Sequence, residues 1–161
     1  NIPYTFLRPA YFMQNFTTSL HNDLVFKNRI YLPAGNSKFT LIYVSDIGAV
    51  SSVVLTNFSE HINKAYELTC NENLTFLEMA KMLSDILKTH IKYVSPNLIS
   101  FFLSKRKDKI HTMFILVMIM LHYFPRFQKD PDTTNWVKEI TKKQPLSFEQ
   151  FINDNRKALT Q

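Results

Sequence analysis

Five histidines are the first candidates for chemistry, because imidazole both ligates metals and exchanges protons near neutral pH. They stand at positions 21, 61, 90, 111 and 122, and no two have the short spacing of a metal motif such as His-Glu-x-x-His. His111 and His122 are eleven residues apart, about three helical turns, so they could share one face of a helix. We interpret all five as hydrogen-bonded core or surface histidines, and we expect no metal site.

The acids, phenols and thiol do not disclose a reaction either. No two acids are spaced for acid–base work, and Asp46, at an expected strand–helix junction, is predicted to cap the helix. None of the seven tyrosines has a lysine four residues later, an arrangement in which the ammonium lowers the phenol pKa. The single cysteine, Cys70, is expected to be buried and inert, and it excludes an internal disulfide. The catalytic residues therefore stay unknown at this stage.

Glycine is scarce, and this excludes several classes of site. Only Gly35 and Gly48 occur in 161 residues, thirteen positions apart. Phosphate-binding loops and nucleophile elbows need neighbouring glycines, because the backbone must turn sharply or approach the ligand closely. We therefore expect no phosphate-cradling loop in these residues.

Composition and charge describe one globular domain. Hydrophobic residues make up 45% and charged residues 20%, and the formal net charge is +6. The basic residues are scattered, so nucleic-acid binding by a basic helical module over residues 100–125 is a minor alternative. The basic run at 105–109 is interpreted as a solvated link. Residues 113–120 (MFILVMIM) are too short to span a bilayer, and a buried helix is favoured over a partner-binding or membrane-surface helix.

The expected elements alternate between strands and helices and then become mainly helical. Residues 2–7 are predicted to be a buried strand, 10–23 a loop with a helical turn, and 29–32 and 39–44 a hairpin or two short strands. Strands are also predicted at 64–69 and 91–94. Capping boxes at Thr75-x-x-Glu78 and Ser147-x-x-Gln150 open predicted helices that end near residues 88 and 159. Further helices are expected at 47–55, 97–104, 109–124 and from Asp132 or Thr133 to residue 140.

A series of short motifs occurs in a characteristic order. The sequence resembles that of NmrA-like atypical short-chain dehydrogenases in six segments: YTFLRPAYFMQN at 4–15, YVSDI at 43–47, NKAYELT at 63–69, LTFLEMA at 74–80, IKYV at 91–94, and a closing stretch of VKEIT at 137–141 followed by QPLSFEQF at 144–151. Residues 97–135 match weakly. The series covers nearly the whole chain.

The resemblance implies an α/β fold: the C-terminal half of a doubly wound Rossmann domain with a small, mainly helical substrate-side subdomain. Residues 1–70 would hold late Rossmann strands and residues 71–161 the subdomain, while the glycine-rich N-terminal half would be absent. The resemblance also implies that Pro9, Ala10, Phe12 and Asn15 lie near the nicotinamide or line the pocket. Ala10 stands where the family usually has glycine.

The function implied by the resemblance is NAD(P)H-dependent reduction of a quinone or similar electrophile. NADP is the favoured cofactor, bound only by the full-length protein, and the chain alone is expected to be inactive. A non-catalytic NAD(P)-sensing regulatory protein that binds a protein partner is the alternative, and a homodimer is also considered. A cytoplasmic location is expected, with no nucleic acid and no membrane span.

Overall fold

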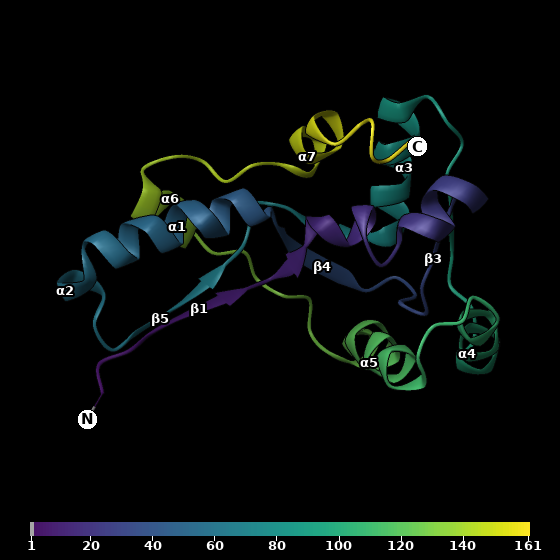
Figure 1. The fold of residues 1–161 in the computed structure, drawn as a ribbon, viewed down its shortest axis with the longest axis horizontal. Helices are drawn as coiled ribbons and strands as arrows, with labels where there is room; N and C mark the ends of the chain where they lie inside the picture. Colours follow the sequence, from purple (N-terminus) through teal and green to yellow (C-terminus); the bar gives the residue numbers. More distant parts are fainter. Residues whose placement is uncertain (1) are drawn as a thin grey trace.

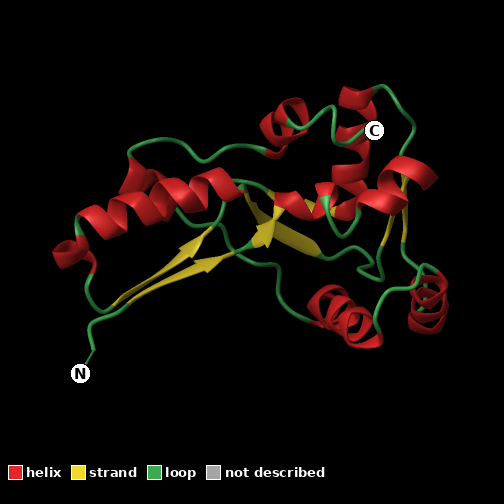
Figure 2. Ribbon diagram, viewed as in Figure 1, coloured by secondary structure: helices red, strands yellow, loops and turns green. Residues whose placement is uncertain are grey.

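The computed structural model describes residues 2–161 as an elongated α/β structure (Figures 1 and 2). Two short parallel strands lie at the end that carries the N-terminus, a small mixed sheet lies in the middle, and helices surround a third strand pair at the opposite end. The C-terminus returns beside helix α3.

The first strand pair carries the start of the chain. Strands β1 (Thr5–Pro9) and β5 (Lys64–Leu68) are parallel and in continuous register. Helices α1 (Val44–Thr56) and α6 (Trp136–Thr141) pack beside this pair, and the short α2 (Phe58–His61) follows α1. Their contact encloses a small core of Ile42, Val50, Val54, Tyr66, Leu68 and Val137.

The prediction of a buried strand at residues 2–7 is wrong in both position and burial. The strand begins at Thr5 and ends at Pro9, and Phe6 is 51% exposed. Leu7 packs against the small core, whereas the ring of Phe6 contacts that of exposed Tyr4 in a tilted arrangement, with centroids 4.6 Å apart. Within residues 2–161, β5 pairs with one edge of β1 and no strand pairs with the other. Successive side chains point to opposite faces, and only Thr5 and Leu7, on one face, are half-buried.

The middle sheet joins segments far apart in sequence. β4 (Lys38–Ile42) runs parallel to β2 (Tyr11–Phe12) and antiparallel to β6 (Asn73–Thr75). β3 (Arg29–Tyr31) pairs instead with β7 (Lys92–Val94). The segments predicted at 29–32 and 39–44 are therefore two separate strands and not a hairpin, because each finds its partners elsewhere.

The segment between β2 and β3 is more helical than expected. It contains the 3-10 turn η1 (Met13–Thr17) and the π-helical turn η2 (Asn22–Phe26). Met13, Phe16 and Leu24 from this segment are fully or almost fully buried in the main core. The sequence of this segment has no clear helical pattern, so we attribute its helical turns to the burial of these apolar residues against the rest of the fold.

Both predicted capping boxes are present. Thr75 caps α3 (Phe76–Leu87) and Ser147 caps α7 (Phe148–Asp154). In each box the cap side chain accepts from the backbone N–H of the third helical residue, and the side chain of that residue accepts from the backbone N–H of the cap. The predicted apolar face of α3 is buried: Phe76, Met79, Ala80, Leu83 and Leu87. Helix α7 ends at Asp154, before the predicted limit, and turns complete the chain.

Helices α4 (Leu98–Lys107) and α5 (Thr112–Tyr123) form the lower part of Figure 1, and the 3-10 turn η3 (Phe124–Phe127) follows α5. The prediction of a buried helix at 113–120 is wrong. Only Ile115 and Met118 of this run are buried, because α5 packs on the body by one face. Its other residues are half-buried or exposed, up to 62% for Met113.

Two of the predicted helix caps are wrong. Asp46 lies in the first turn of α1 but does not cap it; Tyr43 is the N-cap, and the Asp46 carboxylate accepts a hydrogen bond of 2.9 Å from the Leu146 N–H. Burial raises the pKa of Asp46. Helix α6 starts at Trp136 after Asn135, later than a cap at Asp132 or Thr133 would place it, and without a side-chain cap.

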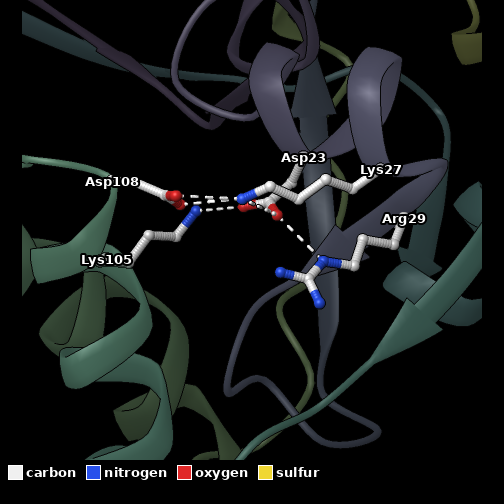
Figure 3. Close-up of polar contacts among 5 residues, drawn as sticks. All are labelled: Asp23, Lys27, Arg29, Lys105 and Asp108. Carbon is white, nitrogen blue, oxygen red and sulfur yellow. Dashed lines mark hydrogen bonds and ion pairs between the residues drawn. The ribbon is translucent and has the colours of Figure 1, made fainter.

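The basic run at 105–109 is not wholly a solvated link (Figure 3). Lys105 is buried, and its ammonium lies 2.5 Å from the carboxylate of buried Asp23 on η2. Arg29 donates to the same carboxylate at 3.0 Å, and Lys27 bridges Asp23 and Asp108. This ion-pair cluster fastens α4 to the segment that precedes β3.

Candidate functional site

A cavity of about 580 Å³ lies between the middle sheet and α5. Three parts of the chain line it: the end of β1 with β2 and η1, strand β4, and α5 with the segment after it. The lining residues used below are Pro9, Ala10, Tyr11, Phe12, Asn15, Lys38, Phe39, Phe114, Val117, Met118, Leu121, His122 and Asp130. In open sheets with parallel strands, ligands bind outside the carboxyl ends of the strands, which is where β1 meets this cavity.

The four predicted site residues come together here. Pro9 is the last residue of β1, and the Ala10 N–H donates to the Leu68 carbonyl at 2.9 Å, which extends the pairing with β5 by one residue. Phe12 and Asn15 follow in β2 and η1. All four line the cavity, whereas their roles toward a ligand stay a prediction.

Sequence reasoning missed a hydrogen-bonded pair on the cavity wall, Tyr11 and His122. The Tyr11 hydroxyl lies 3.1 Å from Nε2 of His122, and Nδ1 of the same ring lies 2.6 Å from the Met118 carbonyl. A carbonyl can only accept, so Nδ1 carries the proton and Nε2 accepts from the Tyr11 hydroxyl.

Both members of the pair are neutral at pH 7. Burial lowers the pKa of His122 to about 4, although the Met118 carbonyl favours the charged ring. Burial also raises the pKa of Tyr11 far above its usual value. The rings of Phe39 and Phe76 lie 5.7 Å from that of Tyr11, edge to face, and keep the pair in apolar surroundings.

One weak signal could have identified His122. It stands four residues after Met118 and seven after Ile115, so it shares the inward face of α5. Tyr11 belongs to the first family-like segment, but nothing local links residues 111 positions apart.

Apart from His122, the wall that α5 contributes to the cavity is apolar. Phe114, Val117 and Leu121 recur at helical spacing on α5, and each is between 40% and 52% exposed. Part of the uncovered apolar face of α5 is therefore the wall of a cavity. At the rim, Lys38 and Asp130 form an exposed ion pair of 3.5 Å.

The other predicted candidates are mostly satisfied. His61 is bonded to the Tyr66 hydroxyl at 2.7 Å, His21 to the Ala158 carbonyl at 3.0 Å, and His111 caps α5. Cys70 is buried, and burial raises its pKa to about 11. Residues 2–161 contain no group of three metal-ligating side chains, and none of their helices is long and apolar enough to cross a membrane.

Comparison with known proteins gives consistent results. No protein-family model matches the chain. Agroclavine dehydrogenase of Claviceps fusiformis is 26% identical over 96% of this chain and 54% of its own length. An NAD(P)H azoreductase of Xenophilus azovorans is 34% identical over 57% of this chain and 32% of its own length.

The fold is found in solved reductases. The NADPH-dependent quinone oxidoreductase of Escherichia coli, in complex with NADPH, superimposes with a TM-score of 0.85 at 16% identity, over 96% of this chain and 54% of that one. The chain thus spans about half the length of agroclavine dehydrogenase and of this structure. The predicted fold class and the resemblance to NAD(P)-dependent reductases are confirmed.

Proposed function

We propose that this chain, which has the fold of the C-terminal part of NAD(P)-dependent reductases, forms the acceptor side of an NAD(P)H-dependent reductase of quinones or similar electrophiles. The observation that carries the proposal is the apolar cavity at the carboxyl end of β1, with Pro9, Ala10, Phe12 and Asn15 on one side and α5 on the other. Residues 1–70 would supply the Rossmann strands and residues 71–161 the substrate side.

The described residues suit one end of the cofactor. Pro9, Ala10 and Phe12 offer apolar contacts to a planar ring, and the Asn15 amide offers both a donor and an acceptor to a carboxamide. The phosphates have no matching site, because Gly35 lies in a turn and Gly48 within α1, and neither forms a glycine-rich loop at a strand–helix junction. These residues would therefore hold the nicotinamide end, with NADP favoured, in a longer protein.

The cofactor, when bound, supplies a hydride; the quinone takes up this hydride and one solvent proton and becomes a hydroquinone. Phe114, Val117 and Leu121 would exclude water and hold a planar acceptor against the β1 end. The Tyr11–His122 pair is neutral, so it adds no charge to the apolar site. Positioning and desolvation are the contributions of this chain.

The test is quinone-dependent NADPH oxidation by the longer protein that the resemblance implies. Val117→Asp puts a charge on the cavity wall and should raise KM for 1,4-naphthoquinone about tenfold or more. Met113→Asp, on the exposed face of α5 away from the cavity, is the matched control and should leave KM unchanged. An equal effect of the two variants would show that the cavity is not the acceptor site.

The alternative is a non-catalytic NAD(P) sensor with a protein partner. Tight NADPH binding without turnover on a broad panel of acceptors would favour it over the reductase.

A cytoplasmic location belongs to the proposal, since the single cysteine suits a reducing compartment. A homodimer is testable by sedimentation.

A further inference from the structure

The cavity wall carries one polar pair whose proton positions follow from the geometry. The Met118 carbonyl fixes the proton of His122 on Nδ1, so Nε2 is an acceptor at neutral pH. The Tyr11 hydroxyl has a single proton, and it is donated to that nitrogen. The Tyr11 oxygen therefore keeps only its accepting lone pairs for any other group, and the Asn15 amide is a donor to the same oxygen, so a ligand uses the remaining lone pair or displaces Asn15.

The accepting oxygen of Tyr11 lies in apolar surroundings, where an unmade hydrogen bond is costly. Beside the pair stands the apolar wall of Phe114, Val117 and Leu121, and aromatic rings enclose Tyr11 on the sheet side. A ligand donor that meets the Tyr11 oxygen gains a hydrogen bond in apolar surroundings. A ligand oxygen that can only accept faces the lone pairs of the Tyr11 oxygen and cannot hydrogen-bond to it. That ligand oxygen has lost its water on binding and stays without a hydrogen-bond partner.

We propose that Tyr11 determines ligand specificity by accepting a hydrogen bond from the O–H or N–H of an aromatic ligand. The site then prefers hydroxyarenes, the chemical class of a hydroquinone product, over arenes of similar shape that can only accept. A quinone belongs to the second group, so the hydroquinone product should bind more tightly than the quinone. This inference rests on the proposed function, because it takes the cavity as the acceptor site, and it names the group in it that distinguishes ligands.

The experiment measures binding without cofactor, by calorimetry on the full 161-residue chain. The probes are 2-naphthol and 2-methoxynaphthalene, which differ in the hydroxyl proton. Tyr11→Phe removes the accepting oxygen and keeps the ring. We expect the preference of the native chain for naphthol to exceed that of Tyr11→Phe about fivefold, the equivalent of one ordinary hydrogen bond. The ether should bind both chains alike.

His122→Phe gives a readout that a purely structural role would not move. It frees the Tyr11 proton, so the hydroxyl can donate to either probe, and the ether should gain affinity while naphthol does not lose it. An unchanged probe preference in both variants overturns the inference, and so does failure of both probes to bind the native chain. Both variants are compared only where their circular dichroism matches that of the native chain.

The two proposals fail in different ways. Tyr11-dependent probe preference without NADPH oxidation by the longer protein would leave the specificity role and remove the reductase. Quinone turnover with a probe preference independent of Tyr11 would leave the reductase and remove the specificity role.

Discussion

Replacement of Asp23 by asparagine should destabilise the protein strongly. The Asp23 carboxylate is 2% exposed and neutralises Lys105, which is 5% exposed over its side chain. Asparagine keeps an oxygen that can accept from Lys105 and Arg29 but leaves the buried ammonium without its countercharge. Loss of one partner of a buried ion pair costs about 3–5 kcal/mol, a large part of the about 5–15 kcal/mol that stabilises a typical domain.

The assay is urea denaturation followed by circular dichroism at pH 7. Asp108→Asn is the control, because Asp108 pairs with Lys27 near the surface, and such pairs contribute about 0–1 kcal/mol. The double variant Asp23→Asn with Lys105→Met removes both buried charges and should recover most of the loss, since apolar replacement of a buried pair is often neutral. A loss below about 1 kcal/mol for Asp23→Asn would refute this reasoning. So would a double variant whose free energy of unfolding is lower than that of Asp23→Asn alone.

The pH dependence gives an independent check on the same residue. Burial alone would raise the pKa of Asp23, but the hydrogen bond and charge of Lys105, with Arg29 and Lys27, outweigh it and hold the pKa below its usual value. A lowered folded-state pKa gives stability that is present above the unfolded pKa, about 3.9, and is lost as pH falls below it. The difference between native and Asp23→Asn chains should therefore shrink in acid.

Three further substitutions or reactions test local features. Thr75→Ala removes the side chain that accepts from the Glu78 N–H and should cost about 1 kcal/mol in urea denaturation; no loss would contradict the capping box. Gly35→Ala should cost about 1–2 kcal/mol, because φ is +56° and the new methyl would lie 2.8 Å from Nε of Arg126; an unchanged midpoint would contradict it. Cys70, whose pKa burial raises to about 11, should react with iodoacetamide far more slowly at pH 8 than in urea, and equal rates measured by mass spectrometry would show an accessible thiol.

Local signals in the sequence predicted the elements that depend on local interactions. The capping box and the helical spacing of Phe76, Met79 and Leu83 predicted α3 and its buried face, because a helix N-terminus and an apolar face are formed within one stretch of chain. The family-like segment at 4–15 brought four residues to the cavity wall. None of these signals says which other elements cover a face.

Two of the errors concern contacts made at long range. Lys105 in a basic run gives no sign of burial, because its counterion is 82 positions away. The run at 113–120 is apolar all round, which is typical of a buried helix, yet α5 buries only one face within the described residues. The hydrophobicity of a helix indicates that it prefers burial, but it does not show whether another element of the fold covers each of its faces.

The two long-range contacts that were missed lie on the cavity wall or on the helix next to it. Helix α5 forms its apolar wall, and the hydrogen bond from Tyr11 to His122 ties that helix to β2. Helix α4 contacts α5 and is itself fastened by Lys105 to Asp23. Burial of Ile115 and Met118 and the hydrogen bond from Tyr11 to His122 therefore act together to hold an apolar helix beside the sheet. An apolar wall held in this way can stay half-exposed and available to a ligand, which a helix buried on all sides could not.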